Sequence, residues 1–291
     1  MSTAAAPDAA DAPLAIICGG GTLPFAVADA VVQRGRRVVL FALRGVADPA
    51  RVMRYPHQWG AVGQLGHFIR FAAVERCKDV VFIGSLVRPA FWQVRLDWAT
   101  LRVLPQIFAA FRGGDDHLLS GVGRIFEQHG FRLLGAHEVA PEILVPEGVL
   151  GARAPSAQDR SDIARGIAFL RATGPFDMGQ AAVVADNQVL AAEAAEGTDA
   201  MLARIAELRA NGRIRLPLGR GVLIKAPKPA QDHRFDLPSI GPQTIEGARH
   251  AGLAGVAVIA GATIIAEPGQ VIAAADRGGM FVLGVSDKSA S

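Results

Sequence analysis

Cysteine, tyrosine and tryptophan are scarce in this sequence. Its 291 residues include two cysteines, one tyrosine and three tryptophans. Cys18 and Cys77 are far apart and lie in or beside apolar runs, so neither a disulfide framework nor a zinc-ligand spacing exists, and both are expected to be reduced core thiols. No two of the seven histidines stand at HxxH or HxxxH spacing, which argues against a zinc hydrolase.

Charge of one sign is not in large excess. There are 30 lysines and arginines against 27 aspartates and glutamates, a formal net charge of +3. No basic stretch is interleaved with aromatic residues, as a nucleic-acid-binding surface would require. The composition therefore predicts a partner other than nucleic acid.

Long apolar runs are also missing. The uncharged stretch 251–266 is shorter than the roughly 20 residues of a membrane-spanning helix. Residues 1–13 have neither the basic nor the apolar region of a signal peptide, and we expect them to form a disordered tail. The sequence predicts a cytoplasmic protein for which any membrane contact would have to be peripheral.

What the sequence does contain is an alternation of apolar strands and amphipathic helices. This βαβαβ order predicts a parallel sheet, and so a Rossmann-like N-terminal domain over residues 14–146. The strands are expected at 14–18, 37–43, 79–83 and 131–134, and the helices at 25–34, 65–76, 100–112 and 116–129.

A Gly- and Pro-rich stretch, 147–156, is predicted to be a linker, and residues 157–291 a second, mixed α/β domain. Its expected helices are 157–173, 198–210, 244–251 and 270–277. Its expected strands are 181–185, 189–192, 222–224, 256–259, 263–266 and 280–285. The turn at 186–188 predicts a hairpin, and Thr198 is expected to cap its helix. The fold class is thus α/β, with a Rossmann-like parallel-sheet domain followed by a second mixed α/β domain.

Two glycine loops follow strands of the first sheet. Gly20, Gly21 and Thr22 come after the first strand and Gly84 after the third, at the carboxyl edge where open α/β sheets bind ligands. A nucleotide diphosphate is the expected guest, although a tight turn without a ligand explains the glycines too. GxGxxG spacing and a Walker lysine are both missing, so neither NAD nor ATP is indicated.

Oxygen-rich segments are candidates for binding a sugar, a phosphate or a metal. Gly114, Asp115 and Asp116 form one such group, for which helix capping alone is the alternative. A second group lies around the predicted hairpin and consists of Gln180, Glu193, Glu196, Thr198 and Asp199. Mg²⁺ prefers such hard oxygen ligands, whereas solvated glutamates beside a helix cap are the structural alternative.

The most informative segment is KAPKPAQDHRFDLPSIGP, from Lys225 to Pro242. Its four prolines exclude a helix or a central strand, so it must be a shaped loop. It projects Lys225, Lys228, Asp232 and Asp236 together, which suits a metal-assisted reaction on a phosphate. A Pro-rich connector with solvated charges is the alternative.

Several of these motifs together resemble one family. They are IICGGGTLPFAVADA, FIGSLVRP, GGDDHLL, GAHEVAPEIL, DMGQAAVV, EAAEGTDAML, KAPKPAQDHRFDLPSIGPQTI and GMFVLGV. In collinear order from about Leu14 to Val285, they are similar to the UDP-2,3-diacylglucosamine pyrophosphatases of the LpxI type, found in lipid A biosynthesis. The resemblance implies Mg²⁺-dependent hydrolysis of UDP-2,3-diacylglucosamine to UMP and 2,3-diacylglucosamine 1-phosphate (lipid X), in a cleft between two domains.

The resemblance also implies roles for residues. Asp236 matches the family's essential acidic residue, Lys225 and Lys228 match its KxxKP pair, and Thr198 with Asp199 matches its EGTD. Phosphoanhydride hydrolysis needs charge neutralisation, a positioned water and a stabilised leaving phosphate. The two lysines and Mg²⁺ are expected to supply the first, and Asp236 to hold the metal or orient the water. The expected metal ligands are Asp236, Asp232, Glu193 and Glu196.

Other readings stay open. A non-catalytic nucleotide-sugar or lipid carrier would use the same cleft without metal-dependent turnover. A nicotinamide-dependent oxidoreductase is disfavoured, because the second strand ends at Arg44 where an acidic residue is expected for the ribose. Acyl chains need an apolar surface, with ordinary core packing as the alternative. The candidates are Phe91, Trp92, Trp98, Leu101, Leu104 and the helix face from Ile163 to Leu170.

Overall fold

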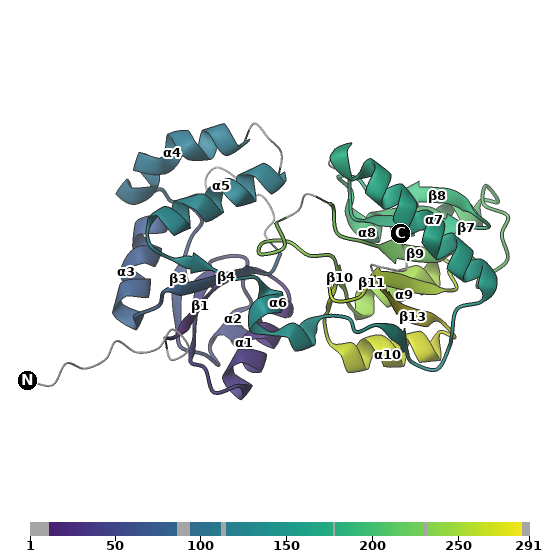
Figure 1. Cartoon of the computed structure of the whole chain (residues 1–291), viewed down its shortest axis with the longest axis horizontal. Helices are drawn as coiled ribbons and strands as arrows, with labels where there is room; N and C mark the ends of the chain where they lie inside the picture. The colour runs from purple at the N-terminus through teal and green to yellow at the C-terminus, as the bar shows by residue number, and fades with distance from the viewer. Residues whose placement is uncertain (1–11, 86–93, 112–114, 177, 230–231, 287–291) are drawn as a thin grey trace, which may run out of the picture. The chain divides into compact units, whose positions relative to one another are not determined.

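The chain divides into two compact units. The computed structural model describes residues 12–85, 94–111, 115–176, 178–229 and 232–286 (Figure 1). The first unit comprises Met1–Glu142 together with Asp232–Asp236, and the second comprises Ile143–Gln231 and Leu237–Ser291. No helix within the described ranges has the length and apolar content that crossing a bilayer requires.

The first unit is built on a five-stranded sheet of order β3-β2-β1-β4-β5 in which all neighbours are parallel. The strands are β1 (Leu14–Cys18), β2 (Val38–Leu43), β3 (His57–Gly60), β4 (Asp79–Ile83) and β5 (Arg132–Leu133). The helices are α1 (Leu23–Gln33), α2 (Pro49–Val52), α3 (Leu65–Glu75), α4 (Trp98–Phe111), α5 (Asp115–Gln128) and α6 (Ala136–Val139). This sheet confirms the Rossmann-like prediction.

Central strands of this sheet are apolar at every position because helices cover both of its faces. All residues of β1 and β2 are buried, which is the pattern of a parallel sheet between helical layers. Side chains of α3, α4 and α5 share one core with β1, β2 and β4, while α1 and α6 lie against the other face (Figure 1). The edge strand β3, whose sequence is HQWG, is half-exposed, so its polar residues gave no strand signal.

The second unit contains a six-stranded mixed sheet of order β6-β13-β11-β9-β7-β8. Its strands are β6 (Gly148–Leu150), β7 (Ala181–Ala185), β8 (Gln188–Ala192), β9 (Val222–Lys225), β11 (Gly255–Ile259) and β13 (Phe281–Val285). The neighbours β13, β11 and β9 are parallel. Strand β6 pairs antiparallel with β13, and β7 pairs antiparallel with both β9 and β8. A separate parallel pair consists of β10 (Ser239–Ile240) and β12 (Ile264–Ile265).

Helices cover both faces of this sheet as well. They are α7 (Ala157–Thr173), α8 (Gly197–Ala210), α9 (Pro242–His250) and α10 (Pro268–Arg277). One core joins α7 to the sheet, and the other joins α8, α9 and α10 to its opposite face. The second mixed α/β domain predicted from the sequence is therefore present.

Local features agree with the sequence predictions in one place and differ in two. Asp186 and Asn187 take φ values of 48° and 63° in the β7–β8 turn, which confirms the hairpin. The stretch 147–156, where a linker was predicted, instead contributes β6 to the sheet, and the first unit gives way to the second at Glu142/Ile143. Thr198 is not the cap of its helix, because α8 begins at Gly197 after Glu196.

Candidate active site

The two glycine loops of the first unit meet at the carboxyl edge of its sheet. Gly20 and Ser85 exchange backbone hydrogen bonds of 2.8 and 3.0 Å. A Cβ at Gly84 would lie 2.7 Å from the Gly20 carbonyl oxygen, and Gly84 has a φ of +102°. The close approach of these two backbones therefore requires glycine at position 84. The sequence correctly predicted that Gly20 and Gly84 lie at one edge.

Part of this edge is already occupied by internal bonds. The N–H groups of Gly19 and Gly20 donate to the carbonyls of Ile83 and Ser85 at 2.9 and 2.8 Å. An anion here would meet the next residues, the exposed Gly21 and then Thr22, which precedes α1. Phosphate binding by this loop stays a prediction.

The GGDDH group lies mostly beyond what the structure describes. Gly114 is outside the described residues, and so are the side chains of Asp115 and Asp116. The backbone of α5 begins at Asp115. The structure does not test the predicted binding role of these three residues.

A buried lysine organises the polar centre of the second unit. Lys225, the last residue of β9, is only 8% exposed. Its Nζ donates to Thr198 Oγ1 at 3.1 Å and to the Ser239 carbonyl at 3.0 Å. Thr198 Oγ1 in turn donates to Glu193 Oε1 at 2.8 Å. We call Gln180, Glu193, Thr198, Lys225 and Ser239 the lysine network.

Glu193 is the hub of this network. Its Oε2 accepts a hydrogen bond from the Gln180 N–H at 2.9 Å, and its carbonyl accepts one from Gly179 at 3.1 Å. A Cβ at Gly179 would lie 2.4 Å from Glu193 Cγ, so glycine is needed there. Both carboxylate oxygens thus tie the start of β7 to the start of α8. This also explains why the Thr198 hydroxyl does not cap α8.

The remaining polar candidates of the second unit lie nearer the surface. Glu196 is exposed and pairs with Arg204 at 3.3 Å, and the exposed Asp199 accepts a hydrogen bond from Gln243 at 3.1 Å. Lys228 is half-buried in the segment after β9. Such exposed ion pairs contribute little to stability, so these carboxylates stay available to a ligand.

Residues 232–236 form a turn that belongs to the first unit. Asp232 receives the Arg234 N–H at 3.1 Å and its guanidinium at 3.0 and 2.7 Å. These hydrogen bonds from Arg234 hold the pKa of Asp232 below its usual value. Arg234 also pairs with Glu127 of α5 at 2.8 Å. We call Asp232–Asp236 the acidic turn.

Phe235 anchors the acidic turn in the core of the first unit. Its ring lies 5.4 Å from that of Phe82, centroid to centroid, and belongs to the same apolar cluster as α3, α4 and α5. A Cβ at Gly123 would lie only 2.5 Å from Phe235 Cζ, so the glycine makes room for the ring. Asp236 follows directly, half-buried, with its N–H bonded to the Asp232 carbonyl at 3.4 Å.

The predicted catalytic residues are therefore divided between the units. Lys225 and Lys228 belong to the second unit, and Asp236 belongs to the first. Within the described parts of the chain, no three His, Cys, Asp or Glu side chains gather as a metal-binding group. The residues still fit Mg²⁺, which usually takes one or two protein carboxylates and otherwise substrate phosphates and water.

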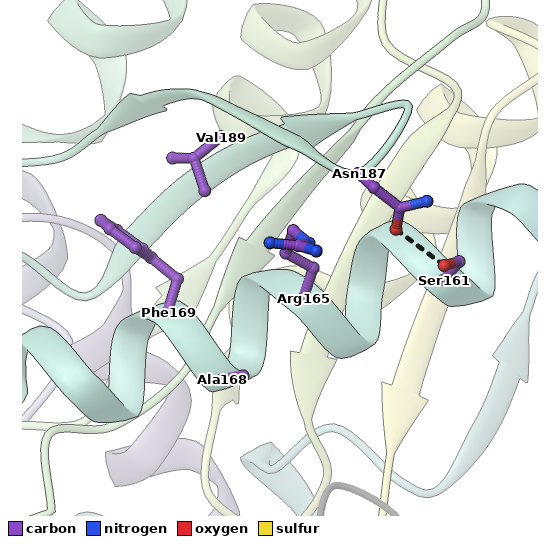
Figure 2. A pocket seen from close by; sticks show the side chains of 6 residues that line it. All are labelled: Ser161, Arg165, Ala168, Phe169, Asn187 and Val189. Carbon is purple, nitrogen blue, oxygen red and sulfur yellow. Dashed lines mark hydrogen bonds between the residues drawn. The ribbon is translucent and has the colours of Figure 1, made fainter.

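A cavity of about 520 Å³ lies elsewhere in the second unit, between α7 and the β7–β8 hairpin (Figure 2). Its lining residues are Ser161, Arg165, Ala168, Phe169, Asn187 and Val189. Ser161 donates to Asn187 Oδ1 at 2.7 Å across one end. No residue of the lysine network lines it, so its size alone does not make it the candidate site.

Neither cysteine is suited to nucleophilic catalysis. Cys18 and Cys77 are free and buried, which confirms the core-thiol prediction. Burial raises the pKa of the Cys18 thiol to about 12 and that of Cys77 to about 11. Because the thiolate is the reactive form, both are inert at neutral pH.

Sequence reasoning missed the residues that hold the candidates in place. The Ser239 carbonyl carries no sequence signal, because every residue has one. Phe235 did leave a signal, as the one aromatic residue in the charged stretch QDHRFDLP. A large apolar side chain among charges often has a pocket to fill, here between Phe82 and Gly123.

The architecture and the polar centre define a class: a two-domain α/β protein with a glycine-lined sheet edge in one domain and a buried lysine network in the other. Comparison with known families agrees. The LpxI N-terminal domain model matches residues 13–143, and the LpxI C-terminal domain model matches residues 146–283. The chain belongs to the LpxI family.

A curated relative matches along nearly the whole chain. It is UDP-2,3-diacylglucosamine pyrophosphatase LpxI of Caulobacter vibrioides, and it is 44% identical over 272 residues. The match covers 94% of this chain and 97% of the relative. Both units, the lysine network and the acidic turn therefore fall within one continuous family relationship.

Proposed function

We propose that this protein hydrolyses the pyrophosphate bond of UDP-2,3-diacylglucosamine, releasing UMP and 2,3-diacylglucosamine 1-phosphate (lipid X), in lipid A biosynthesis. The observation that carries the proposal is the 44% identity to a pyrophosphatase of that name over 94% of the chain. The match also covers 97% of the relative, and both LpxI domain models match this chain.

The lysine network supports a reaction on a phosphoanhydride. Lys225 is held by two hydrogen bonds, at 3.1 and 3.0 Å, so its ammonium is fixed in direction before a substrate arrives. A preorganised cation in a dry site stabilises charge on non-bridging phosphate oxygens more strongly than a mobile one in water. Lys225 would bind a phosphate of the substrate, and Lys228 would add a second positive charge.

Asp236 is the proposed acidic residue of the reaction. It would orient the attacking water and accept its proton, or hold the metal ion. The turn that carries it is fixed by the Arg234 bonds to Asp232 and by Phe235. Rigid attachment matters because a displacement of about 1 Å can cost ~10²-fold in rate.

Mg²⁺ is part of the proposal. The proposed ligands are Asp236, Asp232, Glu193 and Glu196, and Asp236 is favoured among them because it matches the acidic residue of the RxDLP motif. When bound, Mg²⁺ neutralises charge on the phosphate oxygens. The substrate and product are lipids, so we also propose peripheral contact with the cytoplasmic face of the inner membrane.

The test is direct. Purified protein is incubated with UDP-2,3-diacylglucosamine in ¹⁸O-labelled water, with Mg²⁺ or with EDTA, and the product masses are recorded. We expect UMP and the diacylglucosamine phosphate only with Mg²⁺, and the product that carries ¹⁸O identifies the phosphorus attacked.

Two outcomes would count against the proposal. Absence of UMP with every divalent metal would overturn hydrolysis, and saturable substrate binding in that case would establish a carrier. Undiminished UMP release in EDTA would remove the metal from the reaction while leaving the hydrolysis in place.

A further inference from the structure

The inner face of helix α4 packs against the core of the first unit. Val103 is buried and packs with Ala99 and Ile107 in the core that the helix shares with α3 and α5. Thr100 is also buried, and its hydroxyl donates to the Gly63 carbonyl at 2.6 Å. These contacts fix the rotation of α4 about its axis, and therefore fix which side chains face outward.

The outward face is apolar too. Trp98 is 80% exposed, Leu101 42% and Phe108 61%, and Leu96 just before the helix is 50% exposed. Spacings of three and seven residues place the helical ones along one stripe. Ten large apolar side chains are exposed in the described ranges. Three of them lie on α4 and a fourth, Leu96, lies just before it, whereas the others are scattered over several elements. Scattered apolar side chains need no explanation, but a stripe does.

Charge around this stripe has one sign. Arg95 and Arg102 are exposed beside it. Asp97 is the one acidic residue between Val94 and Phe108, and its carboxylate accepts hydrogen bonds from Thr100 N–H at 3.0 Å and His67 N–H at 2.9 Å. The carboxylate is thus turned inward, and among the described side chains from Val94 to Phe108 the charged groups left on the outer face are the two arginines.

We propose that the α4 face docks on a bilayer that carries anionic headgroups. Exposed Trp, Leu and Phe along one stripe flanked by arginine is the composition of a helix that lies in the membrane interface. The apolar stripe would enter the acyl boundary, and Arg95 and Arg102 would reach the lipid phosphates. The choice of a bilayer rests on the proposed function, since the substrate is a diacyl lipid that resides there.

A second copy of the chain is the competing occupant, and the charges disfavour it. A symmetric contact through this stripe would bring Arg95 and Arg102 of two copies together with Asp97 already engaged. Like charges across an interface are repulsive. A surface of anionic phosphates instead complements both arginines.

The experiment measures vesicle binding by the full-length protein with no substrate present. Sedimentation with phosphatidylethanolamine–phosphatidylglycerol vesicles is compared with sedimentation with phosphatidylcholine vesicles. We expect the Trp98→Ser/Phe108→Ser variant to lose about tenfold or more in partitioning to the anionic vesicles. A matched control, Phe176→Ser/Leu218→Ser, removes side chains that are 79% and 82% exposed on the second unit and should stay within about twofold of wild type.

Arg95→Gln/Arg102→Gln should remove the preference for anionic vesicles and the sensitivity of binding to salt. Should the Trp98 variant fold poorly, Leu96→Ser/Leu101→Ser tests the same stripe. The proposal fails if wild-type protein binds neither kind of vesicle, or if the Phe176→Ser/Leu218→Ser control loses as much binding as the Trp98→Ser/Phe108→Ser variant. It also fails if the Trp98 variant converts a dimer to a monomer with vesicle binding unchanged. Vesicle binding is measured without turnover. If the protein proved not to hydrolyse UDP-2,3-diacylglucosamine, the binding result would still hold, and a failure to bind vesicles would not contradict hydrolysis.

Discussion

The two ends of the Lys225–Asp236 segment are held by different kinds of interaction. Lys225 is a buried charge in the second unit, fixed by hydrogen bonds to Thr198 and Ser239. Asp236 is a half-buried carboxylate in the first unit, fixed through its neighbours, by the ring of Phe235 and by the Arg234–Glu127 ion pair. One stretch of sequence therefore supplies each unit with a proposed reactive group.

This difference has consequences for stability. A buried hydrogen-bonded cation cannot be removed without leaving its acceptors unsatisfied, so damage at the lysine network should cost both folding and activity. The acidic turn is anchored by Phe235 at the edge of the first unit's apolar core, which many other side chains also hold together. Damage there should cost activity first. Three substitutions separate these expectations.

The largest effect is expected for Asp236→Asn. The amide keeps the volume of the side chain but can neither accept a proton nor offer a full negative charge to a metal, so kcat should fall by ~10³-fold. Because the amide keeps the shape of this half-buried side chain, the free energy of unfolding should change by no more than ~1 kcal/mol. UMP release and the melting curve check this, with Glu246→Gln on α9 as an exposed control. Activity near the wild-type level would remove Asp236 from the mechanism.

Lys225→Met should come next. The thioether chain fills the same space without a charge, so kcat/KM should fall by ~10²-fold through lost phosphate stabilisation. The acceptors on Thr198 and Ser239 lose their donor, which should lower the free energy of unfolding by ~1–3 kcal/mol. Both quantities are needed, from denaturant unfolding and from steady-state kinetics.

Thr198→Val is the variant to compare with Lys225→Met. It removes the same Lys225–Thr198 bond and also the bond to Glu193 while the ammonium stays in place. The two variants should lose similar stability, and Lys225→Met should lose about ten times more turnover. Equal losses of turnover would make Lys225 a structural residue only.

Much of the fold could be predicted because the strands and helices are locally explicit. The bounds of β1, β4 and α7 are those expected from the sequence, since β1 is fully apolar, β4 is apolar after Asp79, and α7 has the Ser156 cap before it. β3 was missed because HQWG at a sheet edge has no apolar pattern, and β6 because a three-residue strand in a Gly- and Pro-rich stretch looks like a linker.

The candidate site was predictable only residue by residue. Motif chemistry singled out Gln180, Glu193, Thr198 and Lys225, but their mutual bonds depend on the antiparallel register of β7 with β9 and on where α8 begins. The place of the acidic turn depends on Glu127, 107 residues away from Arg234 in the chain. No local pattern encodes such a contact, so the sequence predicted a single loop where the fold divides it between two units.

The smallest effect, and the sharpest test of the comparison, is at the anchor of the acidic turn. Phe235→Ala should reduce kcat about tenfold with KM nearly unchanged, because Asp236 loses its fixed position. It should also lower the stability of the first unit by ~1–3 kcal/mol, since a half-buried ring is lost. Phe235→Leu, which refills most of the space, should recover most of the rate.

Gly123→Ala separates position from stability. A methyl group there would come 2.5 Å from Phe235 Cζ and expel the ring, so turnover should fall as far as in Phe235→Ala. Within α5, however, alanine is favoured over glycine by ~1 kcal/mol, which offsets much of the lost packing. Matching kinetic losses with unequal unfolding free energies would show that the ring acts by positioning Asp236. If turnover instead followed stability across the three variants, Phe235 would be a core residue and the two ends of the segment would be held alike.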